Sequence, residues 1–385
     1  MQHHRYNPNY KFFREPANFT RSTNRELLQY CLGAALYMPA FQNFAEIVIT
    51  KKYSCMTTMV MCFEDAVKEE DVPMTEESAL QNLEELYVAR QEGRLLEGDI
   101  PLMFFRARTV EQFKRFAAKL EPKYYEFIAG FVFPKFNSYT GDDFYEILEQ
   151  VNERSEYIVY GMPILEGREL ALKEGRIEEL HKVKKIIDNN REHTLNVRVG
   201  ATDFSSTFGV RRGIDYTIYD ILTVRDCLLD ILNTFIRDCE YVVSGPVWEY
   251  FSSNWEQRYE NKFKKLPPSE TIHTSLIQNK TIIDTAIDGL LRETMIDRAN
   301  GFIGKTAIHP SHIRFVNALQ AVTREEYEDA CQILNTGGGV IKSKNSNKMN
   351  EIKPHTNWAK RVTMRAEAFG VLENEKEYLE LIKPK

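Results

Sequence analysis

Short apolar segments alternate with amphipathic segments along most of this chain. Runs this short, rich in branched and aromatic residues, predict strands that are buried on both faces of a parallel sheet. The eight predicted strands are Ala34–Met38, Met56–Phe63, Pro101–Phe105, Ile128–Phe133, Tyr157–Leu165, Leu195–Val199, Tyr241–Ser244 and Thr306–Ile308.

Segments with helical periodicity lie between these strands. The clearest predicted helices are Thr75–Gln91, Val110–Leu120, Asp142–Asn152, Arg176–Asn189, Ile218–Phe235 and Ser275–Arg298. Eight strands separated by helices predict an α/β fold, a closed (β/α)8 or TIM barrel. An open, doubly wound sheet is the alternative that the same alternation allows.

The alternation is confined to the middle of the chain, so three parts are expected. Residues 1–24 would form an N-terminal arm, residues 25–322 the barrel, and residues 323–385 a C-terminal helical lid or oligomerisation segment. Within the barrel, residues 248–268 are aromatic and charged and end in two prolines, which predicts a helical insertion followed by a loop.

Composition and charge narrow the classes of partner. The net charge is -6 over 385 residues, without a sustained Lys/Arg block, so we expect no nucleic-acid partner. No apolar run approaches the roughly 20 residues that span a bilayer. The six cysteines are scattered without a CxxC pair, as in a cytoplasmic protein with reduced thiols. His3 and His4 are interpreted as part of a polar terminus rather than a metal site.

Charged residues follow five of the predicted strands. These residues are Glu64 and Asp65, Arg106, Lys135, Glu166, and Asp203. Helix capping would explain any one of them. Because the carboxyl ends of parallel strands form one rim of a barrel, the recurrence predicts a site assembled there.

Glu166 and Asp203 follow neighbouring strands and have no His or Cys beside them. Such hard oxygen ligands suit Mg²⁺, which takes one or two carboxylates together with waters and substrate oxygens. Arg106 and Lys135 would supply positive charge for a carboxylate or a forming enolate. Glu64 or Asp65 could orient Arg106 through a salt bridge.

Five motifs occur in an order that matches a known family. They are ALYMPA at 35–40, CFEDAV at 62–67, FVFPKFNS at 131–138, GATDFS at 200–205 and, most specific, GFIGKTAIHPSHI at 301–313. On these motifs the chain resembles the citrate lyase β-subunit and malyl-CoA lyase family (HpcH/HpaI aldolases), which are Mg²⁺-dependent carbon–carbon lyases with (β/α)8 barrels. It is similar to a divergent branch encoded beside tellurite- and stress-resistance genes.

The resemblance implies roles for individual residues. Glu166 and Asp203 would be the metal ligands, and Arg106 would bind substrate and stabilise an enolate beside Glu64 and Asp65. The implied substrate-binding residues are Arg106, Lys135, Pro163, Gly200 and Ala201. In the tail, KMNEIKPH at 348–355 is similar to a stretch that reaches the site of an adjacent subunit. Glu351 would then be catalytic in a homo-oligomer, a trimer or a pair of trimers.

The expected activity is cleavage or formation of a carbon–carbon bond in a carboxylated hydroxy acid or its CoA thioester. A non-catalytic ligand-binding barrel and a phosphoenolpyruvate-utilising phosphotransfer barrel remain as alternatives. Cys62, Gly167 and the pair Ala107-Arg108 differ from the family pattern on the rim that selects substrate. His309, inside the last motif, is interpreted as a structural hydrogen-bonding residue rather than a catalyst.

Overall fold

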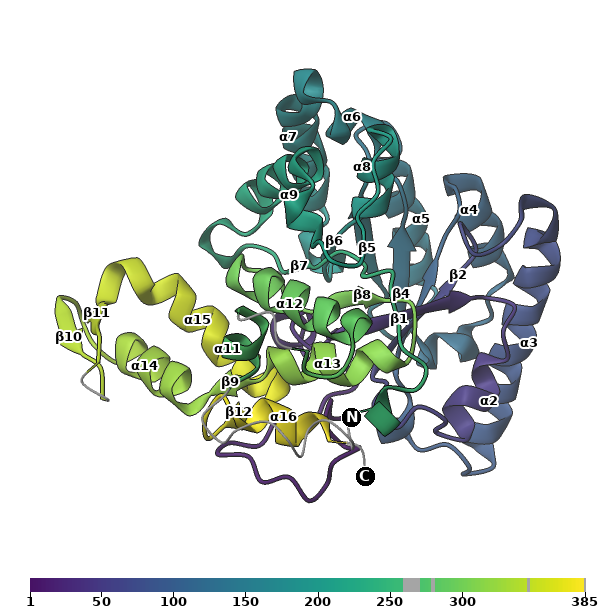
Figure 1. Ribbon diagram of the computed structural model, residues 1–385. Helices are drawn as coiled ribbons and strands as arrows, with labels where there is room; N and C mark the ends of the chain where they lie inside the picture. The colour runs from purple at the N-terminus through teal and green to yellow at the C-terminus, as the bar shows by residue number, and fades with distance from the viewer. Residues whose placement is uncertain (259–270, 278–280, 345–346, 384–385) are drawn as a thin grey trace.

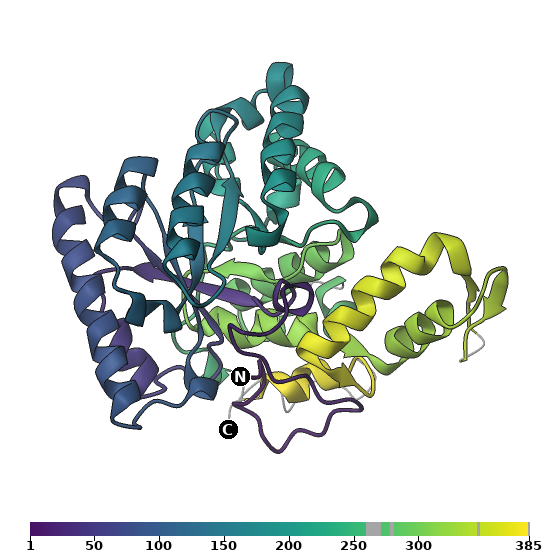
Figure 2. The same ribbon diagram turned by 180° about the vertical axis from the view of Figure 1, so that it is seen from behind.

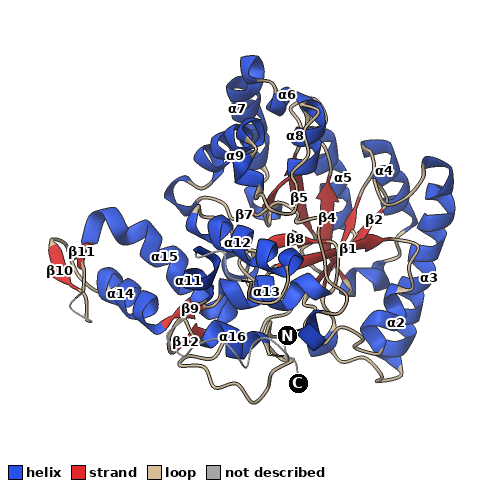
Figure 3. Cartoon of the chain, in the orientation of Figure 1, coloured by secondary structure: helices blue, strands red, loops and turns tan. Residues whose placement is uncertain are grey.

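The computed structural model describes residues 1–258, 271–277, 281–344 and 347–383. Its centre is an eight-stranded parallel sheet in which β1 to β7 pair in chain order and β8 pairs with β1 (Figures 1 and 3). A further parallel bridge, between Gly245 next to β7 and Lys305 of β8, joins the two edges of this sheet. The predicted barrel is therefore confirmed, and the open sheet is excluded. The strands are β1 Ala34–Pro39, β2 Thr58–Cys62, β3 Leu102–Arg106, β4 Ile128–Phe133, β5 Tyr160–Leu165, β6 Val197–Val199, β7 Val243–Ser244 and β8 Lys305–Ala307.

Helices surround the barrel and cover the outer faces of its strands (Figures 1 and 2). All residues of β2, β3, β4 and β5 are buried, as expected for strands that are covered on both faces. Among the described residues, no helix is long and apolar enough to cross a membrane. The barrel helices are α1 Arg25–Leu28, α2 Phe44–Ile49, α3 Val72–Gln91, α4 Val110–Lys119, α5 Gly141–Glu153, α6 Arg168–Ala171, α7 Lys173–Asn189, α8 Ala201–Thr207, α9 Leu222–Phe235, α11 Ile272–Ile277, α12 Thr285–Ala299 and α13 Ser311–Gln320.

One predicted helix is wrong as a single element. In place of Ser275–Arg298 the structure has α11 and α12, with residues 281–284 in a non-helical connection. Helix α12 begins where it does because the side chain of Asp284 accepts a hydrogen bond from the Ile287 amide at 3.0 Å. This is an N-cap interaction, which satisfies an otherwise unpaired helix donor.

The predicted insertion at 248–268 can be followed only in its first half. Residues 255–258 are helical, and residues 259–270 lie outside the described residues. Trp248 and Trp255 are buried, so these aromatic residues serve packing, as is common for such side chains.

The C-terminal segment forms a helical hairpin that projects from one side of the barrel (Figures 1 and 2). Helices α14 and α15 share a small apolar core of their own. In its first half, α15 bonds to segments that enter β7 and β8: the Cys239 thiol donates to the Asn357 carbonyl, and Arg361 donates to the Gly301 carbonyl. The remaining elements are α14 Arg324–Leu334, α15 Ile352–Phe369, α16 Glu377–Ile382, β9 Val322–Thr323, β10 Val340–Lys342, β11 Met349–Glu351 and β12 Val371–Leu372.

These contacts correct part of the expected lid role. They place α15 at the amino ends of the barrel strands, opposite the rim that carries the predicted site. The segment therefore does not cover the rim of its own barrel. A role in a neighbouring subunit is unaffected and stays a prediction.

The N-terminal arm is packed rather than peripheral, which corrects the interpretation of His3 and His4 as a polar terminus. Both imidazoles are buried. The His3 ring stacks on Phe369 at 4.3 Å between centroids and hydrogen-bonds Thr57 at 2.9 Å, and His4 hydrogen-bonds the Phe369 carbonyl at 3.1 Å. The arm therefore connects the barrel to the last turn of α15.

Burial of His4 predicts a pH-dependent contribution to stability. Burial lowers the pKa of His4 from 6.5 to about 3, so the unfolded chain takes up a proton that the folded chain refuses. The contribution of His4 is complete above pH 6.5 and is lost as the pH falls toward 3, by up to about 1.4 kcal/mol per pH unit. We expect the stability advantage of wild type over His4→Gln, measured by urea unfolding, to shrink between pH 7.5 and 5.5. His181→Gln, on the exposed face of α7, is the control; an advantage that does not change with pH would refute the assignment.

Candidate functional site

A cavity of about 600 Å³ opens at the carboxyl ends of the barrel strands. Its walls come from residues that lie in or follow β1, β2, β3, β5, β6, β7 and β8. Of the predicted site residues, it is lined by Asp65, Arg106, Glu166, Gly200 and Asp203. The rim predicted from strand-end charges therefore surrounds a cavity.

Arg106, the last residue of β3, is the centre of a buried ion-pair cluster. Its Nη2 lies 2.6 Å from Glu64 Oε2 and 3.1 Å from Glu166 Oε1, and its Nη1 lies 3.2 Å from Asp65 Oδ2. The predicted contact between the acidic pair and Arg106 is thus present. Burial lowers the pKa of Arg106, but the charges of Glu166 and Glu64 outweigh that effect and raise it. The guanidinium therefore stays charged and aligned.

Lys135 takes part through its backbone as well as its side chain. Its amide donates to Glu166 Oε1 at 3.0 Å, and its ammonium pairs with Glu64. Lys135 adopts a positive φ of 48°, which few residues other than glycine favour. This turn directs the amide at Glu166, so Lys135 fixes the position of that carboxylate.

Glu166 and Asp203 are close enough to affect each other. Burial raises the pKa of Glu166 to about 7; Arg106 opposes the shift and the charge of Asp203 adds to it. Burial also raises the pKa of Asp203, helped by the charge of Asp65. At Gly200, a Cβ atom would lie 2.1 Å from Glu166 Oε2, so glycine is needed for this carboxylate to sit against β6.

The donor set fits Mg²⁺. Two carboxylates with raised pKa values share one cavity, and a divalent cation between them would relieve their repulsion. No group of three or more His, Cys, Asp or Glu side chains in the described part of the chain could hold a metal by itself. Mg²⁺ is typically bound through one or two carboxylates and completes its shell with other oxygens, which the pair Glu166 and Asp203 allows.

Comparison with known proteins gives the family. Residues 26–371 match the family model described as C-C_Bond_Lyase of the TIM-Barrel fold. The chain belongs to the C-C bond lyases of the TIM-barrel fold. No curated protein sequence matched it.

Solved structures of lyases are distantly similar. A CitE protein from Mycobacterium tuberculosis in complex with magnesium, acetoacetate and coenzyme A is 16% identical, with a TM-score of 0.49, covering 88% of this chain and 99% of that one. The citrate lyase β-subunit from M. tuberculosis complexed with oxaloacetate and magnesium is 17% identical, with a TM-score of 0.40, covering 75% and 96%. An HpcH/HpaI aldolase/citrate lyase family protein from Burkholderia cenocepacia J2315 is 10% identical, with a TM-score of 0.42, covering 74% and 93%. None of these identifies the substrate of this C-C bond lyase.

Pro163 and Ala201 do not line the cavity of this lyase. Pro163 is buried on the face of β5 opposite to Ile164 and Glu166, because successive strand residues point to opposite faces. Ala201 begins α8 and is buried, while its neighbours Gly200 and Thr202 line the cavity. The expectation that Pro163 and Ala201 contact substrate is corrected on this geometry.

Glu351 lies at the distant end of the tail hairpin. It is exposed in β11, and its amide donates to His355 Nδ1 at 3.2 Å. Figures 1 and 2 both show β10 and β11 at the tip of the hairpin, far from the barrel. Glu351 cannot reach the cavity of its own chain, and its role at a neighbour's cavity stays a prediction.

Arg108 accounts for one departure from the family pattern. Its Nη1 donates to three carbonyl oxygens of the β2–α3 loop, those of Phe63, Glu64 and Val67, at 3.4, 3.3 and 3.0 Å. This loop carries the acidic pair that orients Arg106. Arg108 therefore holds the loop in shape from the next strand of the barrel.

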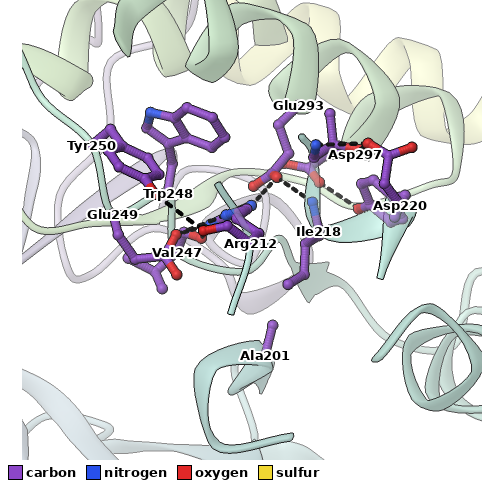
Figure 4. Close-up of polar contacts among 12 residues, drawn as sticks. Ala201, Arg212, Ile218, Asp220, Val247, Trp248, Glu249, Tyr250, Glu293 and Asp297 are labelled. Atoms are coloured by element: carbon purple, nitrogen blue, oxygen red, sulfur yellow. Dashed lines mark hydrogen bonds and ion pairs between the residues drawn. The ribbon is translucent and has the colours of Figure 1, made fainter. Parts of the chain in front are cut away.

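Lys305, in the 301–313 motif, belongs to a buried network outside the cavity. Its ammonium lies 2.8 Å from Glu293 Oε1 and 2.6 Å from Asp297 Oδ2 on α12. Arg212, in the β6–α9 connection, pairs with Glu293 and Glu249 and donates to the Val247 carbonyl at 2.6 Å (Figure 4). Because Val247 lines the cavity, the network links α12 and β8 to the rim.

The contacts of His309 agree with its interpretation as a structural hydrogen-bonding residue. Its Nδ1 hydrogen-bonds Ser311 Oγ at 2.8 Å at the start of α13, and its ring stacks on Phe251 at 4.3 Å between centroids. The conformation joins the end of β8 to the aromatic segment that follows β7. A catalytic contact is not needed to explain this histidine.

Proposed function

We propose that this protein is a Mg²⁺-dependent lyase or aldolase that cleaves or forms a carbon–carbon bond in a carboxylated hydroxy acid or its CoA thioester. The observation that carries the proposal is the juxtaposition of Glu166 and Asp203 with the charged, oriented Arg106 in one cavity. Family membership supports the reaction class, and the cavity chemistry supports the metal.

The proposed roles follow from charge and position. Glu166 and Asp203 would hold the metal, which supplies Lewis-acid polarisation of substrate oxygens when bound. Breaking the carbon–carbon bond of a hydroxy acid leaves one half as an enolate, whose negative charge needs a fixed counter-charge. Arg106 provides it without reorganisation because Glu64 and Asp65 already hold the guanidinium in place.

The metal assignment predicts a simple binding result. Mg²⁺ titrated calorimetrically into wild type should give one saturable site, and Glu166→Ala should abolish it because one of two ligands is lost. Glu174→Ala, on the exposed surface of α7, should bind as wild type does. Equal binding by Glu166→Ala and wild type would overturn the assignment.

Activity measurements distinguish the lyase from a ligand-binding barrel and from a phosphotransfer barrel. A screen of hydroxy acids, 2-oxo acids and their CoA esters with and without Mg²⁺ should give metal-dependent cleavage or condensation. Tight binding without turnover anywhere in the screen would instead indicate a ligand-binding barrel. Release of phosphate from phosphoenolpyruvate would indicate the phosphotransfer reaction.

We further propose that Glu351 acts at the cavity of an adjacent subunit in a homo-oligomer. Glu351→Gln and Arg106→Met would then each lack activity alone, and mixed oligomers would contain some cavities with both native residues. Co-refolding or co-expression of the two variants should restore up to about a quarter of wild-type activity if residues pair at random. A monomer in light scattering, or no recovery in verified mixed oligomers, would contradict this proposal.

A further inference from the structure

Arg198 is a charged residue in the interior of the barrel. It lies at the centre of β6, between Val197 and Val199, and is 1% exposed. Its guanidinium lies over the ring of Tyr37 on β1, 5.5 Å from the centroid, and its Nη2 donates to Thr306 Oγ1 on β8 at 2.7 Å. Neither β1 nor β8 is a neighbour of β6, so the side chain must cross the barrel interior to make these contacts.

Among the residues that the structure describes, no carboxylate forms an ion pair with Arg198. Its Nε and Nη1 are buried and have no hydrogen-bond partner among the same residues. Arg106 in the same cavity pairs with three carboxylates, and Arg212 in the network behind it pairs with two. An isolated buried guanidinium is costly unless an anion is supplied from outside.

The surroundings of Arg198 are those of a ligand site. Arg198, Tyr37 and Thr306 all line the cavity that contains Glu166 and Asp203. The Tyr37 hydroxyl is also buried without a partner, which adds a donor beside the guanidinium. A planar carboxylate matches the fork of an arginine better than it matches any other side chain, because two parallel hydrogen bonds can form.

We propose that Arg198, together with Tyr37 and Thr306, binds a second carboxylate of the substrate, so that the substrate is a diacid. The inference rests on the proposed function, in which the first carboxylate is held at the Glu166–Asp203 metal site. Arg198 then selects diacids over acids with a single carboxylate. It acts by binding substrate, beside Tyr37 of β1 and Thr306 of β8.

Matched ligand pairs test the proposal in the intact protein with saturating Mg²⁺. Malate and 2-hydroxybutyrate differ by one carboxylate, as do 2-oxoglutarate and 2-oxopentanoate. In calorimetric titrations, wild type should bind the better diacid about 10- to 100-fold more tightly than its monoacid partner, the range of a charge-assisted hydrogen bond. Arg198→Gln should remove that preference while leaving Mg²⁺ and monoacid affinity unchanged.

Two further variants keep the test decisive. Arg198→Lys retains the charge but not the fork and should keep part of the preference, so it replaces Arg198→Gln should the latter fail to fold. Arg237→Gln, on the exposed surface after α9, should retain the full preference. Equal wild-type affinity for both members of each pair, or an undiminished preference in Arg198→Gln and Arg198→Lys, would overturn the inference even where Mg²⁺ binds. If wild type does not bind Mg²⁺ at all, the proposed function is overturned instead.

Discussion

Replacing Arg106 by methionine should lower kcat/KM by about 100- to 1000-fold on whichever substrate the screen identifies. The guanidinium is the one group in the described cavity that three carboxylates hold in a single orientation. Loss of a preorganised charge is felt most where negative charge develops, so kcat should fall more than KM rises. Steady-state kinetics at saturating Mg²⁺ would measure both parameters.

The variant needs a control for structure, because Arg106→Met leaves Glu64 and Glu166 buried without their partner. Arg106→Lys keeps the charge, and added guanidinium ion should restore part of the activity of the methionine variant if the cavity is intact. Arg237→Met should retain wild-type rates. Unchanged kcat in a folded Arg106→Met variant would reject the enolate-stabilising role.

Replacing Glu293 by alanine should destabilise the fold by about 3–5 kcal/mol. The Glu293 carboxylate is fully buried and pairs with both Lys305 and Arg212, and it also accepts from the Ile218 amide at 2.7 Å. Removing it would leave two buried cations facing each other across the lost carboxylate. Breaking a buried pair costs far more than forming it contributes, because the remaining charge keeps its desolvation penalty.

Chemical unfolding of wild type and Glu293→Ala would measure this difference. Glu178→Ala removes an exposed partner of Lys182 on α7 and should leave the unfolding midpoint unchanged. Glu293→Gln keeps the shape and one acceptor and should fall between wild type and the alanine variant. A midpoint for Glu293→Ala equal to that of Glu178→Ala would show that the network does not stabilise the fold.

The barrel could be predicted from the chain because its signals are local. Each strand is a short apolar run bounded by polar residues, and every predicted strand overlaps an observed one. The location of the site could be predicted from the charges at strand ends, because parallel strands bring their carboxyl ends to one rim whatever the details of packing. Glu166, Asp203 and Arg106 were found in this way.

The face of a fully buried strand could not be predicted in the same way. Strands covered on both sides lack polar–apolar alternation, so the pattern does not tell which residues point into the barrel. The resemblance places Pro163 in the site, and nothing in the pattern of this strand indicates that it does not line the cavity. Arg198 could have been recognised from the sequence, because it is a charged residue at the centre of an apolar strand. It was not selected because only charges at the ends of strands were considered.

Long-range pairs were also beyond sequence reasoning. Arg212, Glu293 and Lys305 come from three separate elements, and nothing in their spacing indicates that they meet. The direction of the C-terminal hairpin could not be predicted either, because it depends on tertiary contacts such as that between Asn357 and Cys239. Such contacts are specific to the folded surface and leave no periodicity.

Arg108 indicates how substrate selection can change without a change in the path of the β2–α3 loop. It holds the β2–α3 loop through carbonyl oxygens, which every residue type offers, rather than through particular side chains. Side chains in that loop can therefore change while the path of its backbone is retained. Directed evolution of new substrate preference should for this reason begin with a library at Ala66, which lines the cavity, and keep Asp65 and Arg108 constant.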